Sequence, residues 1–268
     1  MSHQIKSPPA VLAFSGLDPT GGAGIQADIE AIASMGCHCL PVITALTVQN
    51  SQNVIRYETV DSNLFEEQAR TVLQDIPVKA IKIGMLGSVD LIQALHGILK
   101  DHPNIPVVLD PIISAGGGKT LSASETLKAM QELLIPMTTI ITPNSEEARL
   151  LAREADTLDA CAEQLQDMGC EYVLITGTHE DTPAVTNSLY GNHRLLESFN
   201  WDRLAQTYHG SGCTLAACIS AMLAHGLDPF NAVHEAQEYT WQSLSEGYQL
   251  GKGQYFPNRF YWSRGDEH

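Results

Sequence analysis

The stretch VLAFSGLDPTGGAGIQADIEAIAS, residues 11–34, indicates the fold. Residues 11–15 form an apolar run typical of a buried strand, residues 16–24 are rich in glycine, and residues 25–34 have a helical pattern. A strand, a glycine loop and a helix in this order allow a ligand to approach the backbone closely. The glycine spacing does not match GxGxxG, so the sequence does not support a dinucleotide fold.

The same alternation continues along the chain. Apolar runs at 40–48, 80–85, 106–109, 138–142 and 172–176 predict further strands, and the clearest helical patterns between them lie at 64–73 and 158–168. Such alternation implies crossover connections and a mostly parallel sheet covered on both faces. We therefore expect an α/β fold, with ligands at the carboxyl ends of the strands.

Two further features complete the predicted organisation. Residues 186–190 and 195–199, around Gly191 and Asn192, predict a β-hairpin at the edge of the sheet. Asp228 followed by Pro229 predicts the start of a last helix that runs towards Glu246. The sequence contains no internal repeat or linker, so residues 1–268 are expected to form a single domain.

Composition limits the function. The chain has 268 residues and a formal net charge of −16, which argues against binding to nucleic acid or to an anionic membrane surface. The six cysteines lack a disulfide-framework spacing, and residues 1–9 lack a signal-peptide core. No apolar segment approaches the roughly 20 residues that span a bilayer. A cytoplasmic protein that acts on small molecules is expected.

The sequence Gly210-Ser211-Gly212-Cys213-Thr214 precedes an apolar run at 215–223 and predicts an anion-binding helix N-terminus. A phosphate or a developing oxyanion would be held there by backbone amides and the helix dipole. Cys213 at this terminus is expected to have a lowered pKa and to serve as a base or nucleophile. The alternative is a glycine turn before a core helix, with Cys213 packed as a small apolar residue.

The tripeptide Gly118-Lys119-Thr120 resembles part of a P-loop, yet position 113, where the first glycine belongs, is Ile113. Ser122 and Glu125 form a capping-box pattern, which places the helix start after Lys119. A Walker A site is therefore rejected. Residues 116–118 are expected to form a flap, and Lys119 either reaches a phosphate or is solvated.

Several carboxylates are candidate site residues. Asp28, in the first turn of its helix, is expected to hold a substrate hydroxyl or merely to complement the helix dipole. Asp110 follows an apolar strand and is a candidate for metal or phosphate chemistry, or a turn residue. Asn144 and Glu147 could serve nucleotide phosphates and Mg²⁺, although helix capping alone also explains this pair.

Gln49 ends the strand pattern at 40–48. Its planar amide could pair edge-on with an aminopyrimidine, because it donates to a ring nitrogen while it accepts from the exocyclic amine. A surface glutamine at a strand end is the alternative.

Together these segments resemble the hydroxymethylpyrimidine and phosphomethylpyrimidine kinases of thiamine biosynthesis, which are ribokinase-like proteins. The resemblance covers nearly the whole chain. It is carried by SGLDPTGGAGIQAD (15–28), VITALTVQN (42–50), KIGML (82–86), LDP (109–111), ITPN with Glu147 (141–147) and HGSGCTL (209–215). The first and last stretches are the most specific, because most relatives in the superfamily have Asp where this chain has Cys213.

The resemblance implies a three-layer αβα sandwich with a mostly parallel central sheet, ATP and Mg²⁺ as cofactors, and a homodimer. It also implies roles for individual residues. Gly16, Ala23, Asp28, Thr47, Gln49, Met85 and Ile112 would line the pyrimidine pocket, Asn144, Thr176 and Lys119 would serve the nucleotide, Asp110 and Glu147 would serve Mg²⁺, and Gly210, Ser211 and Gly212 would form an anion hole around the catalytic Cys213.

Two positions depart from the family pattern. Thr47 occupies a place that is often apolar, and Thr176 stands where many members have a phosphate-contacting lysine. The phosphate charge would then be met by Mg²⁺, by the anion hole and by Lys119.

The implied activity is phosphorylation by ATP of 4-amino-5-hydroxymethyl-2-methylpyrimidine to its monophosphate and then to the diphosphate. Cys213 as a thiolate is expected to accept the hydroxyl proton in the first transfer. The alternatives are a vitamin B6 kinase of the same superfamily and a non-catalytic sensor that binds the phosphorylated pyrimidine.

Overall fold

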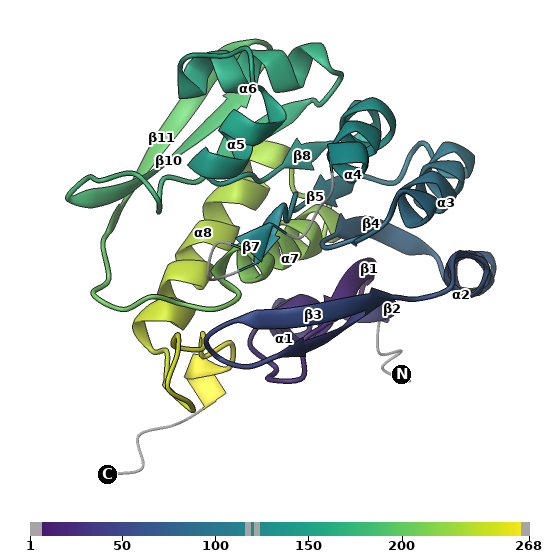
Figure 1. Ribbon diagram of the computed structural model, residues 1–268, viewed down its shortest axis with the longest axis horizontal. Coiled ribbons are helices and arrows are strands. Elements are labelled where there is room, and N and C mark those ends of the chain that lie inside the picture. Colours follow the sequence, from purple (N-terminus) through teal and green to yellow (C-terminus); the bar gives the residue numbers. More distant parts are fainter. Residues whose placement is uncertain (1–6, 116–118, 121–123, 264–268) are drawn as a thin grey trace, which may run out of the picture.

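The computed structural model describes residues 7–115, 119–120 and 124–263, which fold around one large β-sheet (Figure 1). The strands of this sheet are β1 (Ala10–Leu17), β2 (His38–Gln49), β3 (Val54–Thr59), β4 (Val78–Ile83), β5 (Val107–Leu109), β8 (Ile140–Ile141), β9 (Tyr172–Ile175), β10 (Ala184–Gly191) and β11 (Arg194–Asp202). A separate pair consists of β6 (Ser114–Ala115) and β7 (Lys119–Thr120).

The sheet has nine strands in the order β11-β10-β9-β8-β5-β4-β1-β2-β3. The strands from β9 through to β2 pair in parallel, which confirms the predicted α/β class. Their carboxyl ends therefore lie along one edge of the sheet. The strand order reverses its direction beside β1, since β2 lies on one side of β1 and β4 on the other.

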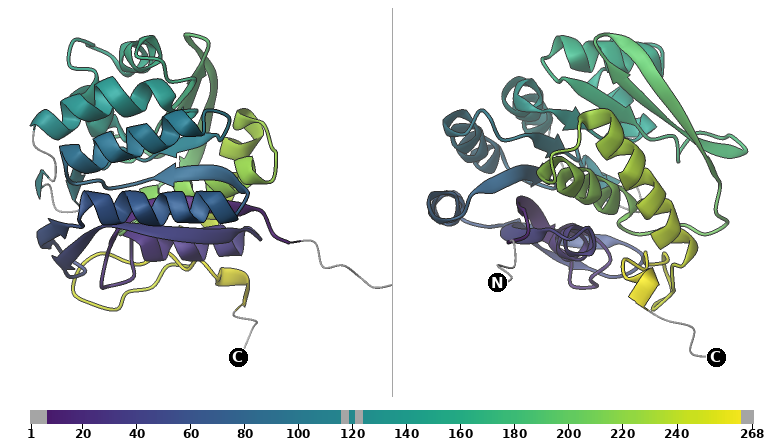
Figure 2. Two further views of the ribbon diagram at one scale, coloured as in Figure 1. Left: turned by 90° about the vertical axis from the view of Figure 1, so that its right-hand side faces the viewer. Right: turned by 180° about the vertical axis from the view of Figure 1, so that it is seen from behind.

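Helices cover both faces of the sheet (Figure 2). Strand β1 divides the core, because Leu12 and Phe14 pack on one face while Val11 and Ala13 pack on the other. The first face is covered by α2 (Ser62–Asp75), α3 (Val89–Asp101), α4 (Ser124–Ala129), the π-turn Met130–Leu134, the 3₁₀ turn Ile135–Met137, α5 (Ser145–Leu151) and α6 (Leu158–Asp167), and the second by α1 (Gly24–Ser34), α7 (Ser211–Ala224) and α8 (Pro229–Ser245).

Antiparallel hairpins close both edges of the sheet. The predicted hairpin is confirmed as β10 and β11, but its turn lies at Asn192 and His193, with φ of 52° and 54°, while Gly191 belongs to β10. The opposite hairpin, β2 and β3, was not predicted. Its turn depends on Asn50, whose side-chain oxygen accepts hydrogen bonds from the backbone of Gln52 and Asn53.

Two predicted helix starts can be compared with the structure. Helix α8 begins at Pro229 with Asp228 as its cap, as expected. Lys119 lies in strand β7 and α4 begins at Ser124, so Lys119 is not in the first turn of a helix. The predicted flap at 116–118 and Ser122 lie outside the described residues. Within the described part of the chain, no helix has the length and apolarity that a membrane crossing requires.

Candidate active site

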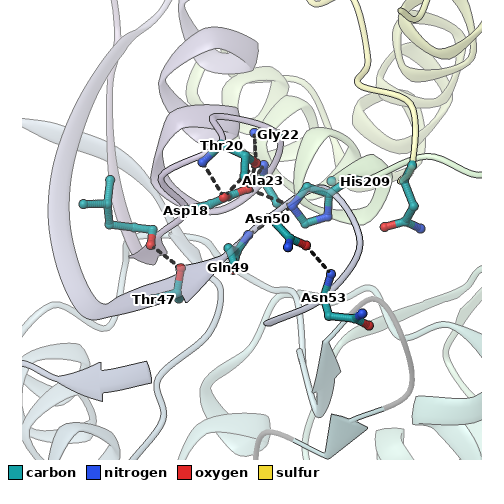
Figure 3. Close-up of polar contacts among 12 residues, drawn as sticks. Asp18, Thr20, Gly22, Ala23, Thr47, Gln49, Asn50, Asn53 and His209 are labelled. Atoms are coloured by element: carbon teal, nitrogen blue, oxygen red, sulfur yellow. Dashed lines mark hydrogen bonds and ion pairs between the residues drawn. The ribbon is translucent and has the colours of Figure 1, made fainter. Parts of the chain in front are cut away.

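The glycine loop that follows β1 closes around the carboxylate of Asp18 (Figure 3). This carboxylate accepts hydrogen bonds from the backbone amides of Thr20 at 2.8 Å and Ala23 at 2.9 Å. It also lies 2.7 Å from Nε2 of His209. Burial alone would raise the pKa of Asp18, but the hydrogen bonds from His209 and Thr20 outweigh it and lower the pKa. Asp18 thus fastens the loop to the segment before α7.

The loop meets the N-terminus of α7 through two glycines. Gly210 has a φ of 82°, and a side chain there would collide with the carbonyl of Gly22. Gly210 is the N-cap and supplies no side-chain cap to the helix. Ser211 is half-buried and Gly212 is exposed, so the first turn of α7 is open to solvent. The first amides of a helix have no intrahelical partner, so anion binding at this open turn stays a prediction.

Cys213 lies below this open turn and is 6% exposed. It lies close enough to the carboxylate of Asp110 for each group to influence the pKa of the other. Burial raises the pKa of Cys213 to about 12, and the negative charge of Asp110 contributes in the same direction. The prediction of a lowered pKa is therefore wrong for this structure, because desolvation outweighs the helix dipole.

Asp110 and Glu147 form a pair of buried carboxylates. Asp110 follows β5, and its Oδ2 has no hydrogen-bond partner among the described residues. Glu147 belongs to a capping box at the start of α5, with its Oε2 3.0 Å from the amide of Asn144. Burial first, and then the charge of Asp110, raise the pKa of Glu147 to about 8.

This pair is suited to a divalent cation. Among the residues that the structure describes, no group of three or more His, Cys, Asp or Glu side chains could hold a metal. Mg²⁺ commonly uses only one or two carboxylates and completes its coordination with water and substrate phosphates. An unpartnered oxygen on Asp110 beside the buried Glu147 carboxyl fits that donor set.

Two of the predicted nucleotide residues lie side by side at the ends of β8 and β9. Asn144 and Thr176 form a parallel bridge, and the Thr176 carbonyl accepts the Ser145 amide at 3.1 Å. Thr176 is half-buried, and only its backbone is needed for this bridge. Its hydroxyl supplies no positive charge, so Thr176 does not replace the phosphate-contacting lysine that many family members have at this position.

Three of the predicted pocket residues meet in a small apolar cluster. Met85 packs with Ile112 and Ala45. A Cβ at Gly16 would lie 3.5 Å from the sulfur of Met85 and 3.6 Å from the carbonyl of Ala45. The structure therefore brings Gly16, Met85 and Ile112 together at the ends of neighbouring strands.

Three further predicted pocket residues, Ala23, Thr47 and Gln49, lie around the rim of the glycine loop (Figure 3). Ala23 is the N-cap of α1 and lies against Gly210. Thr47 donates through its hydroxyl to the carbonyl of Leu17 at 2.9 Å. Gln49 points to His209, with 3.2 Å between their side-chain Nε2 atoms.

Asp28 does not line the surface of a pocket. Its side chain is fully buried, where its Oδ1 lies 2.9 Å from Nζ of Lys82 and its Oδ2 accepts the hydroxyl of Ser15. The prediction that Asp28 holds a substrate hydroxyl is thus wrong in this structure, because the buried ammonium occupies its oxygens. Sequence reasoning missed Lys82, although a lysine inside the apolar run at 80–85 was a usable signal.

Arg259 is a second residue that the sequence did not reveal. This guanidinium is 2% exposed, and it donates to the hydroxyl of Thr214 at 2.9 Å, to Glu30 at 3.0 Å and to the carbonyl of Gly22. It thereby ties the C-terminal segment to the glycine loop, to α1 and to the first turn of α7. An isolated arginine in a glycine-rich tail gave no pattern from which this contact could be predicted.

A hollow of about 360 Å³ lies between the glycine loop and the C-terminal segment. It is separate from the predicted site, because none of the site residues proposed from sequence lines it. Its walls are formed by Leu17, Asp18, Pro19, Thr20, Gly21, Gln26, Glu30, Tyr248, Leu250, Phe256 and Arg259.

Comparison with known sequences identifies relatives of the chain. It is 31% identical to the hydroxymethylpyrimidine/phosphomethylpyrimidine kinase of Staphylococcus aureus strain Mu50 over 260 residues, which cover 94% of each chain. It is 36% identical to a probable chloroplastic thiamine biosynthetic bifunctional enzyme of Oryza sativa subsp. japonica over 251 residues. That match covers 91% of this chain and 46% of the rice protein, so the chain spans about half of the rice protein's length.

Solved structures share the fold. An ADP complex of Bacillus subtilis pyridoxal kinase matches with a TM-score of 0.87 and 28% identity, over 97% of this chain and all of that one. The phosphomethylpyrimidine kinase of Clostridium difficile 630 matches with a TM-score of 0.77 and 30% identity, over 88% and 99% of the two chains. The predicted ribokinase-like class is therefore confirmed.

The family model described as phosphomethylpyrimidine kinase matches residues 18–258, which include the glycine loop, both buried carboxylates and the whole of α7. The chain belongs to the phosphomethylpyrimidine kinase family.

Proposed function

We propose that this protein transfers the γ-phosphoryl group of ATP to the hydroxymethyl group of 4-amino-5-hydroxymethyl-2-methylpyrimidine, and then a second phosphoryl group to the monophosphate. The observation that carries this proposal is the open N-terminus of α7. Its exposed first turn lies directly beside the buried carboxylate of Asp110, with a Cβ at Gly212 only 3.7 Å from Oδ1. A family of kinases supplies the reaction type.

Positioning and charge account for most of the chemistry. The amides of Gly210, Ser211 and Gly212 would stabilise negative charge on the phosphoryl group during its transfer. Mg²⁺, held by Asp110 and Glu147, would neutralise charge on the nucleotide phosphates. In the first transfer the substrate hydroxyl would give its proton to the neighbouring groups Cys213 and Asp110, of which the Asp110 charge raises the pKa of the thiol. The second transfer needs no base, because its nucleophile is a phosphate oxygen that is already anionic.

The proposed substrate lies between the apolar cluster and the loop rim. Gly16, Met85 and Ile112 would contact the faces of the ring, and the Gln49 amide would read its edge after turning from His209. On the other side of the transferred group, Asn144 and Thr176 would contact the nucleotide. The side chain of Lys119, which was also predicted to serve the nucleotide, lies outside the described part of the structure. We treat residues 1–268 as one catalytic domain that works as a homodimer in the cytoplasm.

Pyridoxal kinase activity is the second candidate. It is favoured by the likeness to Bacillus subtilis pyridoxal kinase, whose TM-score exceeds that of the Clostridium difficile enzyme. A pyridine that carries a hydroxymethyl group presents a nucleophile similar to that of the pyrimidine. The apolar cluster alone does not distinguish the two rings.

A coupled ADP-release assay with Mg²⁺ and ATP tests the proposal directly. Hydroxymethylpyrimidine, its monophosphate and pyridoxal are supplied separately, and then the two alcohols compete in one reaction. We expect turnover of both pyrimidines and preference for the pyrimidine alcohol over pyridoxal. Turnover of pyridoxal alone would establish the second candidate. Saturable pyrimidine binding without ADP release would identify a sensor and refute the kinase proposal.

A further inference from the structure

A lysine is fully buried directly beneath the candidate active site. Lys82 lies on β4 between Ile81 and Ile83, whose side chains pack on the opposite face of the sheet. Its side chain therefore enters the layer between the sheet and helices α1 and α7. Lys82 and its partner Asp28 both have no exposed surface. Burying two charges is costly, and such a pair is weak evidence of a purely stabilising role.

The ammonium of Lys82 is held at the carboxyl edge of the sheet. It lies 2.9 Å from Oδ1 of Asp28 and 3.0 Å from the hydroxyl of Ser15. A Cβ at Gly84 would lie 2.7 Å from Nζ, so the ammonium extends past the end of β4 over a residue without a side chain. Substitution of Gly84 by any other residue would displace it.

This position brings the charge close to the phosphoryl-binding elements. The carbonyl of Ile83, beside Gly84, accepts the backbone amide of Asp110 at 2.8 Å. A Cβ at Gly212 in α7 would in turn lie 3.7 Å from Oδ1 of Asp110. The end of β4, where the ammonium lies, thus adjoins Asp110, and Asp110 adjoins the first turn of α7.

The orientation of the ion pair leaves a net positive effect at the site. Burial is the largest influence and raises the pKa of both Asp110 and Cys213. Of the two charges in the pair, Lys82 lowers both pKa values more than Asp28 raises them. The same conclusion follows from geometry, because the ammonium lies over Gly84 at the strand end that pairs with the backbone of Asp110, where the proposed reaction brings phosphate groups. Thr176 supplies no charge there.

We propose that Lys82 is an electrostatic positioning residue, whose buried ammonium, anchored by Asp28 and Ser15, favours phosphate-bearing ligands and phosphoryl transfer at the N-terminus of α7. This inference rests on the proposed kinase function. The ammonium does not contact either substrate. It acts electrostatically, across Asp110 and the first turn of α7. Its field is weakly screened on the side of Asp110 and Cys213, because both of these residues are buried.

The test compares two variants that differ in the lysine alone. Asp28→Asn keeps the cation and removes its counter-charge, whereas the double variant Asp28→Asn/Lys82→Met removes both charges of the ion pair. Calorimetry measures the affinity for the pyrimidine alcohol and for its monophosphate. The ADP-release assay gives kcat and KM, and a thermal melt reports the fold of each variant.

We expect the double variant to bind the monophosphate about tenfold more weakly and to lose about tenfold in kcat, while its affinity for the neutral alcohol stays the same. Asp28→Asn should keep the preference for the monophosphate. If both affinities fall together with Tm, or if the double variant keeps the phosphate preference, the inference is overturned. A wild-type protein that turns over none of the substrates would instead refute the proposed function, and the two binding curves would still test Lys82.

Discussion

The pKa of the Cys213 thiol is subject to two opposing influences: the N-terminus of α7 lowers it, and the buried carboxylate of Asp110 raises it. Because burial raises the pKa of the thiol to about 12, a role for Cys213 as proton acceptor depends on the neighbouring carboxylate of Asp110. We expect Cys213→Ala to slow phosphorylation of the pyrimidine alcohol by roughly tenfold or more, and to slow phosphorylation of the monophosphate much less. Separate rate measurements for the two steps provide the check.

Cys218 offers a matched control for this prediction. It lies further along α7 and is fully buried, with no site carboxylate as a partner. Cys218→Ala should change both rates alike. Equal losses in the two steps for Cys213→Ala would show that the thiol has no part in accepting the proton.

Gln49 is expected to recognise the ring of the substrate. Its side chain is half-buried, and its Nε2 lies 3.2 Å from Nε2 of His209. Gln49→Ala should weaken pyrimidine binding by about 5- to 30-fold, since about two hydrogen bonds are lost, and should leave ATP affinity unchanged. Calorimetric titration with each ligand measures this, and the exposed Gln52→Ala in the same turn is the control. An unchanged pyrimidine titration would remove Gln49 from the pocket.

The Glu147 carboxyl makes stability depend on pH. Its pKa is about 8 in the folded chain, against an ordinary value of 4.5. Between these values the folded state binds more protons than the unfolded state, so stability falls as pH rises from about 5 to about 8. In metal-free buffer, Glu147→Gln should flatten this fall in the free energy of unfolding.

Urea denaturation at several pH values provides the measurement. The exposed Glu146, on the same turn of α5, is the control, and Glu146→Gln should keep the wild-type slope. Identical slopes for Glu147→Gln and the wild type would contradict the burial of an ionisable pair with Asp110.

Three elements converge on Arg259, and its loss should affect all of them. Arg259→Met removes donors from Glu30, from Thr214 and from the buried carbonyl of Gly22. We expect a loss of about 3 kcal/mol in the free energy of unfolding. ADP affinity should also fall, because the glycine loop is released from the start of α7.

Glu30→Gln is the matched variant for this contact. The Glu30 side chain is 26% exposed, so water can replace part of the ion pair and the cost should be smaller. If Arg259→Met is as stable as the wild type in denaturant titrations, the tail does not fasten the loop.

The sequence predicted those elements that have a strong hydrophobic periodicity or a clear boundary, such as a helix cap. The helix from Pro229 carried its own cap, and the edge hairpin carried an alternating pattern. The second hairpin was missed because β2 and β3 are joined by a turn that lacks glycine, at residues 50–53. Its strand β3 has mixed polarity at an edge of the sheet, where no buried run marks it.

At the scale of the whole molecule, the sequence predicts where the candidate site lies because parallel strands end along one edge. Asp110, Asn144, Thr176 and Met85 all follow strands, and their proximity could be expected from that rule alone. The partners of Asp28 could not be predicted, since they depend on which strands become neighbours and on how deeply each carboxylate is buried. The pKa of Cys213 is raised, where the sequence predicted a lowered one, for the same reason: it depends on how deeply the thiol is buried.

The contact between Gly22 and Gly210, fastened by Arg259, joins segments that are made at opposite times during translation. The glycine loop leaves the ribosome early, but its partners follow only when synthesis is nearly finished. A nascent chain thus carries an incomplete form of the proposed phosphate-binding site. Premature termination before residue 259 should release a polypeptide that retains much of the sheet and yet cannot close its own catalytic centre.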